Sequence, residues 1–329
     1  MSERLNFNQT AFDSLSAISL NTVLDTLTLT LSQPIEAFID PAKRLFIPFL
    51  FSSLLLIAWV IYRQSQSHRS LPRINVKAYW QHPSHLVDMS LWLFNGFLKL
   101  SLIAPLFISQ LGASILVHKA LYASFGDSPN VSVNATVLIS LFTLAYFIFD
   151  DLTRFALHWA MHRFSGLWYF HKVHHSAEVL SPLTVYRLHP VEMVLYNCRQ
   201  LITVGLIAGL FSYCFQGKIT GWMILGVDAA GFIFNLMGSN LRHSHIWLSF
   251  GKFEKIFISP AMHQIHHSTE PEHRHKNFGS ALSIWDTLIK SSKLSKSVSI
   301  NPAKISQLSF GLGQESNVTA AHTKETNAA

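Results

Sequence analysis

The chain has 329 residues, of which 49% are hydrophobic and only 13% are charged, against about 25% charged residues in a typical soluble domain. This composition argues against a water-soluble globule, and the large apolar share argues against a disordered polymer. The net charge of +7 comes from Lys and Arg scattered between apolar runs, so we expect anionic lipid, and no nucleic acid, as its partner. Two cysteines exclude a disulfide framework and a four-thiolate metal site.

The hydrophobic pattern predicts an all-α integral membrane protein with about four to five transmembrane helices. The chain divides into a polar N-terminal tail at 1–44, helices and loops at 45–133, a histidine-rich region at 134–290 and a disordered polar tail at 291–329. The first span is 45–62, eighteen uncharged residues between Arg44 and Arg63. Further spans are expected at 100–117 and 134–149, and a hairpin of two spans between Arg199 and residue 241, interrupted by Asp228.

The basic residues of the loops predict the orientation of the chain. The loop after the first span carries three arginines and Lys77, whereas the loop between the second and third spans carries only Lys119. The positive-inside rule therefore places residues 63–85 in the cytoplasm. Counting spans forward brings residues 150–199 and those after the hairpin to the same side. All histidine clusters are then expected to face the cytoplasm, as a single shared site requires.

Histidine is the unusual component, because thirteen of the eighteen histidines lie between His158 and His275. His158 and His162 lie four residues apart near the end of the third span, so their imidazoles share one face of a helix. Such a pair is weak evidence for a metal by itself. Two HxxHH motifs strengthen it, each placing three imidazoles within about one helical turn; they consist of His171, His174 and His175 and of His263, His266 and His267.

These eight histidines predict a site for two metal ions. Each buried imidazole left without a partner would cost about 1 to 3 kcal/mol, and metal coordination satisfies all of them together. Eight ligands exceed what one zinc ion takes. With no cysteine offered, a two-iron site that leaves open positions for dioxygen fits best. A ferritin-like carboxylate site is disfavoured, because the Glu-x-x-His segment from Glu270 to His273 contains Pro271.

The order HxxxH, HxxHH and HxxHH at the ends of membrane spans resembles the fatty acid hydroxylase and sterol desaturase superfamily of integral-membrane di-iron oxygenases. The resemblance extends from Asp150 to Leu288, within a catalytic domain at 134–290. Three further segments fit the family's order. HPVE at 189–192 resembles its His-Pro segment, HSH at 243–245 its additional ligand position, and SIWDTL at 283–288 its closing Trp-Asp signature.

The resemblance implies a set of site residues. The metal ligands would be His158, His162, His171, His174, His175, His189, His243, His263, His266 and His267. A backbone hydrogen bond is the alternative for His189, and of His243 and His245 we expect His243 to be the ligand. Glu192, His245 and Asp286 would orient ligand rings from outside. The other histidines are expected at the surface or in a solvated loop: His68, His82, His85, His118, His273, His275 and His322.

The resemblance also implies an O2-dependent oxidoreductase with two irons per chain. It would hydroxylate or desaturate an unactivated C–H bond of a lipid such as a fatty acid or sterol, in lipid biosynthesis or modification. A separate reductase or electron carrier is expected, because the sequence has no dinucleotide-binding fingerprint and no cysteine cluster. A zinc-dependent membrane hydrolase or a metal transporter remains the alternative. The hydrolase would want an HExxH motif, and the transporter would want ligands near the bilayer midplane.

Overall fold

The computed structural model describes residues 28–29, 31–32, 35–66, 76–103, 109–129, 131–215, 229–297 and 310–312. Within these ranges the secondary structure is helical, apart from two isolated β-bridges, Phe257 with Leu282 and Ser268 with Phe310. The expectation of an all-helical chain is therefore confirmed for the described residues.

Three helices are long and apolar enough to cross a membrane: α3 (Ile47–Gln66), α8 (Ala135–Arg163) and α10 (Pro190–Cys214). They coincide with three of the predicted spans. The stretch at 100–117 is divided between a π-helical turn (Lys99–Ile103) and the 16-residue helix α7 (Gln110–Phe125). Most of the second half of the predicted hairpin, including Asp228, lies outside the described residues, and α12 (Ala229–Leu236) is its described end.

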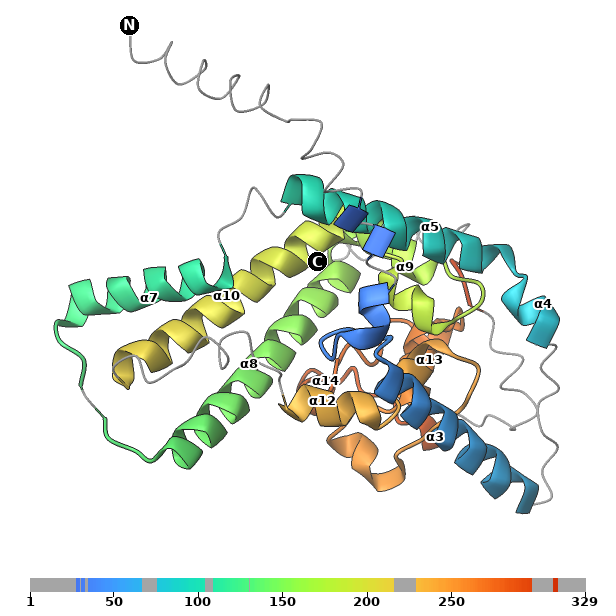
Figure 1. The fold of residues 1–329 in the computed structure, drawn as a ribbon. Coiled ribbons are helices and arrows are strands. Elements are labelled where there is room, and N and C mark those ends of the chain that lie inside the picture. Colours follow the sequence, from blue (N-terminus) through green and yellow to red (C-terminus); the bar gives the residue numbers. More distant parts are fainter. Residues whose placement is uncertain are drawn as a thin grey trace, which may run out of the picture.

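Helices α7, α8 and α10 pack together as one group (Figure 1). Leu138 and Phe142 of α8 meet Val204 and Ala208 of α10 in a buried apolar cluster. The approach of α7 to α10 depends on Gly209, because a Cβ atom there would lie 2.6 Å from the Cβ of Val117. A side chain at position 209 would push the two helices apart.

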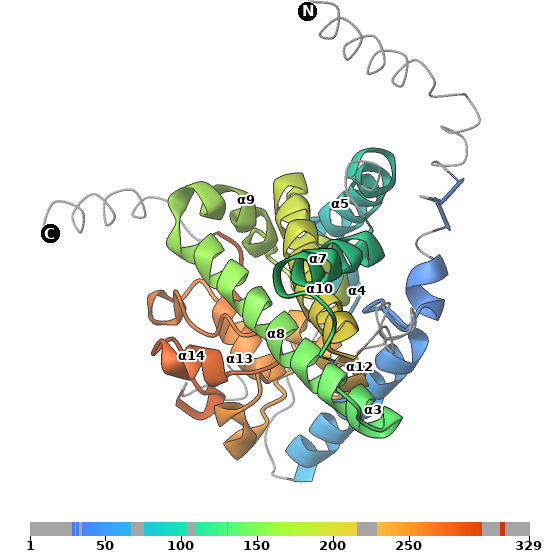
Figure 2. The same cartoon turned by 90° about the vertical axis from the view of Figure 1, so that its left-hand side faces the viewer.

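A second group of short elements gathers at the end of α8 and beside α3 (Figures 1 and 2). It consists of three helices, α9 (Ser165–His175), α13 (Pro260–His267) and α14 (Ile284–Leu288), with α4 (Val76–Trp80) at its edge. Five 3-10 helices complete it: Pro182–Tyr186, Ser239–His243, Gly251–Lys255, Pro271–His273 and Ser295–Ser297. Loops and single turns predominate here, so hydrogen bonds of side chains to backbone hold the chain in place.

Buried ion pairs join elements that lie far apart in the sequence. Asp88 of α5 (Pro83–Leu98) accepts a hydrogen bond from Arg187 Nε at 2.5 Å, and both side chains are almost fully buried. Asp150 of α8 accepts from Arg199 of α10 at 2.7 Å and from Arg154 at 2.6 Å. These contacts fix the end of α8, and with it the helix turns that carry the first two histidines.

Candidate metal centre

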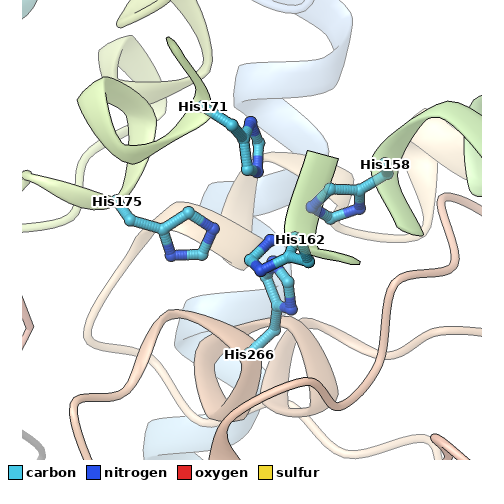
Figure 3. A group of neighbouring side chains, drawn as sticks. All are labelled: His158, His162, His171, His175 and His266. Atoms are coloured by element: carbon cyan, nitrogen blue, oxygen red, sulfur yellow. The ribbon is translucent and has the colours of Figure 1, made fainter. Parts of the chain in front are cut away.

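Nine histidines converge in two buried groups beyond the end of α8. The first cluster comprises His158, His162, His171, His175 and His266, and the second comprises His174, His243, His263 and His267. In each cluster the available ring nitrogens all lie within 4.8 Å of one another. Figure 3 shows the first cluster, whose rings come from α8, α9 and α13 and turn toward a common centre.

Helix geometry explains how each HxxHH motif serves both clusters. Residues four apart share a helix face, whereas the residue between them points to the side. On α9, His171 and His175 enter the first cluster and His174 enters the second. On α13 the assignment is reversed, because His263 and His267 enter the second cluster and His266 enters the first. Each helix therefore contributes two ligands to one cluster and one to the other.

The two clusters are in direct contact. The rings of His175 and His267, one from each cluster, stack with centroids 4.5 Å apart. The rings of His174 and His267 lie 4.8 Å apart inside the second cluster, and those of His175 and His266 lie 4.8 Å apart inside the first. The arrangement is thus a pair of neighbouring sites that share one boundary.

Three rings of the first cluster are oriented from behind by acceptors. Nδ1 of His158 lies 2.7 Å from the carbonyl oxygen of Phe278, and Nδ1 of His266 lies 2.7 Å from that of Lys276. Nδ1 of His171 lies 2.9 Å from Glu192 Oε1. Since each acceptor requires the proton on Nδ1, the lone pair of Nε2 is left to face the cluster.

The inner nitrogens of the first cluster are short of partners. The Nε2 atoms of four of its rings, on His162, His171, His175 and His266, are buried without a hydrogen bond to the described part of the chain. Buried polar atoms normally have a partner, because each one left alone costs free energy. A metal ion at the centre would accept all four lone pairs, so the donor set fits a metal with imidazole ligands.

In the second cluster, four Nε2 atoms crowd together. Nε2 of His243 lies 3.3 Å from that of His174, 3.2 Å from that of His267 and 3.1 Å from that of His263. A neutral imidazole carries only one N–H, so the three short contacts of His243 Nε2 cannot all be hydrogen bonds at the same time. A cation among them would satisfy all four, which is the same fit as in the first cluster.

Burial keeps these imidazoles neutral. It lowers the pKa of His174 to about 3, and it lowers the pKa values of His171, His175 and His243 well below the ordinary value, with the neighbouring histidines adding to the effect. The pKa values of the three α13 histidines are lowered in the same way. A metal therefore has no proton to displace from these ligands near neutral pH.

Of the residues expected to orient ligands, only Glu192 touches a cluster ring. Asp286 accepts hydrogen bonds from the backbone N–H groups of Phe278 and Gly279, each at 2.8 Å. It thereby holds the turn whose Phe278 carbonyl faces His158. His245 lies outside both clusters, with its ring 5.3 Å from that of Tyr79.

His189 also lies outside the two clusters. Its Nδ1 accepts a hydrogen bond from the backbone N–H of Val191 at 3.1 Å, so it caps the start of α10. Its ring packs against Phe170, with centroids 4.8 Å apart. The backbone hydrogen bond that was the alternative for this residue is the contact that the structure contains.

Sequence reasoning missed several polar anchors. Asp151 accepts hydrogen bonds from Ala281 N, Leu282 N and Trp285 Nε1 at 2.7 to 3.0 Å, joining α8 to the loop behind the clusters. Its position seven residues before His158, on the same helix face, was the available signal. Two histidines expected to be exposed, His85 and His273, are buried, so that expectation was wrong for them. His85 Nε2 contacts the Tyr79 carbonyl at 2.8 Å.

A cavity of about 220 Å³ opens beside both clusters. Histidines of both clusters line it together with apolar side chains, among them Val185 and Leu188. A second cavity, of about 520 Å³, adjoins it and is more polar. A small apolar group can therefore reach the space next to both candidate metal positions.

Comparison with known proteins places this site in a family. Residues 143–291 match the family model described as fatty acid hydroxylase. Alkylglycerol monooxygenase of Danio rerio is 25% identical over 142 residues, which is 43% of this chain and 28% of that protein. Ornithine lipid hydroxylase OlsE of Rhizobium tropici is 27% identical over 133 residues, 40% of this chain and 36% of that protein. The alkylglycerol monooxygenase of Homo sapiens is 23% identical over 142 residues, 43% of this chain and 28% of that protein.

The matched region thus spans little more than a third, at most, of the length of these relatives. No solved structure matches the chain. All nine clustered histidines lie inside the region that matches the family model. Over residues 143–291, the chain is similar to the fatty acid hydroxylase family, and its similarity to these lipid monooxygenases and hydroxylases lies in the part that carries the histidines.

Proposed function

We propose that the chain is an integral-membrane di-iron oxygenase that hydroxylates, or desaturates, an unactivated C–H bond of a lipid. The observation that carries this proposal is the pair of adjoining, buried, all-histidine clusters in a chain with membrane-spanning candidates. The relatives that are named as lipid monooxygenases and hydroxylases support the reaction class. Hydroxylation is the simpler outcome, since those names describe it.

We infer the ligands of each iron from the two clusters. The first iron would be held by His158, His162, His171, His175 and His266, and the second by His174, His243, His263 and His267. His243, rather than His245, is then the ligand after the hairpin. When bound, the two irons would supply the activation of dioxygen that breaking an unactivated C–H bond requires.

The protein's own groups prepare the site for that metal pair. The Phe278 and Lys276 carbonyls and the Glu192 carboxylate hold protons on the outer nitrogens of three rings. This fixes the tautomer and ring orientation and raises the basicity of the inner nitrogens. Burial of all nine rings, with His162 the least buried, limits water around the reacting bond.

The cavity beside the clusters would receive the carbon that is oxidised. The part of its wall formed by Pro182, Val185 and Leu188 suits a hydrocarbon segment, and the lipid would enter from the bilayer between the membrane helices. The histidine clusters would face the cytoplasm, where a separate reductase or electron carrier would deliver two electrons per turnover. O2 is the co-substrate.

Metal content tests the proposal. Detergent-purified protein should contain about two irons per chain by elemental mass spectrometry, since there are two separate donor sets. A double variant, His174→Ala with His266→Ala, removes one proposed ligand from each cluster and should lose most of the iron at both sites. His118→Ala is the matched control, because His118 lies away from the clusters and contacts Ser212 at 3.1 Å.

Turnover provides the second readout. With a reductase system and 18O2, the parent should place labelled oxygen in a lipid product, or form a double bond, and the double variant should do neither. Zinc as the bound metal, or iron retained in full by the double variant, would refute the di-iron assignment.

A further inference from the structure

The two cavities beside the metal centre share three lining residues, Arg44, Arg154 and Ser280. Arg242 also lines the smaller cavity, next to histidines of both clusters. Positively charged side chains therefore surround the space where the cavities adjoin. Their partners decide whether this charge is already neutralised.

Arg242 is 5% exposed and lacks a carboxylate partner among the described residues. It donates one hydrogen bond, to the carbonyl oxygen of Ser280, and its guanidinium carbon lies 4.6 Å from the ring centre of Phe234. Its Nε is buried with no hydrogen-bond partner in the described part of the chain. One N–H of a buried cation is thus left unsatisfied beside the cavity, which is costly.

Arg44, which is half-buried, also has no carboxylate partner among the described residues. It donates to Asn235 Oδ1 at 2.7 Å, and no described carboxylate lies within 4.0 Å of its guanidinium. Its own carbonyl accepts from Asn240 at 2.8 Å, which fixes the backbone beside the cavity. Burial, together with the nearby positive charge of Arg154, lowers the pKa of Arg44 to about 10.

The acidic groups around the cavities are already engaged. Asp150 is shared between Arg154 and Arg199, so one carboxylate serves two guanidiniums. Asp151 accepts three hydrogen bonds from the loop at 281–285, and Glu192 faces His171. Asp40 lies at the edge of the larger cavity, 4.0 Å from Lys43. Asp151 also acts on Arg242 through its charge, but no described carboxylate lies within 4.0 Å of the guanidinium of Arg44 or Arg242.

An oxyanion would satisfy both arginines at once. Guanidinium groups bind carboxylate and phosphate with charge-assisted hydrogen bonds, which are stronger where water is excluded. We propose that Arg44 and Arg242 bind the oxyanion head, a carboxylate or a phosphate, of the lipid that the metal centre oxidises. This inference rests on the proposed function and specifies its substrate class as an anionic amphiphile.

The site also limits which carbon is oxidised. Arg242 and histidines of both clusters line the same cavity, of about 220 Å³. A head group held by Arg242 would lie in the same small space as the metal positions. The oxidised carbon should therefore lie within a few bonds of the anionic head.

Direct binding tests the assignment without turnover. Detergent-purified, metal-loaded protein would be titrated with radiolabelled oleic acid, oleyl alcohol and oleoyl lysophosphatidic acid, which share one chain and differ in the head. At least one acidic lipid should bind roughly 10- to 100-fold more tightly than the alcohol, as expected for a charged hydrogen bond in a buried site. The tighter of the two acids identifies the head as carboxylate or phosphate.

The variants locate the preference. Arg242→Gln and Arg44→Gln should each abolish most of the preference for the acidic lipid over the alcohol. Arg242→Lys should keep part of this preference because the positive charge remains. Arg274→Gln is the matched control. Because Arg274 is exposed, this variant should bind the lipids as the parent does. Iron content and thermal unfolding of each variant report folding, and Arg44→Gln carries the test if Arg242→Gln fails to fold.

Three results would overturn the inference. The acidic lipids and the alcohol could bind equally tightly, or both glutamine variants could retain the preference for the acidic lipid. Inorganic phosphate could also displace the bound lipid with an affinity equal to that of the lipid. The last result would mean a site for a free anion. A parent protein that shows the head-group preference but contains no iron would refute the proposed oxygenase alone, so the two failures are distinguishable.

Discussion

The contact between Glu192 and His171 gives the sharpest prediction about the metal centre. Both side chains are almost completely buried, and Glu192 Oε1 lies 2.9 Å from Nδ1 of His171. Glu192→Ala would leave this Nδ1 proton without an acceptor and free the ring to turn or change tautomer. Loss of such an outer partner typically weakens metal binding about 10- to 100-fold, equivalent to about 1.4 to 2.7 kcal/mol.

Only the first cluster should respond, because His171 is not part of the second. Titration with Fe²⁺ against a competing chelator should therefore show one weakened and one unchanged site in Glu192→Ala. Glu192→Gln keeps an oxygen acceptor at the same place, so its first site should weaken less. Glu178→Ala, which alters an exposed carboxylate, is the control. Parent-like affinity at both sites in Glu192→Ala would refute the orienting role, and equal weakening of both would indicate general damage.

Three further predictions concern stability and are checked by thermal or chemical unfolding. Asp151→Ala removes the acceptor of three buried hydrogen bonds and should lower the free energy of unfolding by about 3 to 5 kcal/mol; a loss below 1 kcal/mol would contradict this role. Gly209→Ala places a Cβ 2.6 Å from Val117 and should cost about 1 to 3 kcal/mol, more than Gly205→Ala, whose nearest contact is 3.2 Å. Equal costs would show that the helices adjust freely. In the metal-free protein, the folded pKa of His174 is about 3 and lies below its unfolded value of 6.5, so the unfolded chain binds the proton first. The melting temperature should be insensitive to this group above pH 6.5 and fall as the pH drops from 6.5 toward 3, and a flat profile from pH 8 to 5 would refute the buried neutral state.

The sequence predicted the parts of the fold that depend on local periodicity and charge. The expected span at 45–62 became Ile47–Gln66, and the helix expected from residue 134 starts at Ala135, with the Asn134 side chain accepting from Val137 N. The HxxxH and HxxHH spacings were sufficient to group their histidines. These features follow from the apolar run, the N-cap preference and the helical repeat, all of which are local.

The contacts that support the clusters could not be predicted in this way. The acceptors behind His158 and His266 are the backbone carbonyls of Phe278 and Lys276, and a carbonyl has no residue-type signature. The position of these carbonyls depends on two hydrogen bonds to the same loop. Asp286 accepts one from Phe278 N, and Asp151, which lies on the distant helix α8, accepts one from Ala281 N. The burial of His85 has the same cause, since its carbonyl partner Tyr79 belongs to a neighbouring turn.

The opposite use of two identical motifs has a mechanical origin. Helix α9 begins directly after α8, with Phe164 as the shared cap, so the His171 and His175 face turns back toward the histidines at the end of α8. That cluster accepts a fifth ring, His266, from α13. The remaining face of α13 then meets His174 and His243, which gives the other cluster four rings. If each cluster holds one iron, the four-histidine site keeps more of its coordination positions open, and it lies on the cavity that we assign to the lipid. The unequal division of one repeated motif would thus make the two metal positions chemically different, with the second the better placed to meet the substrate.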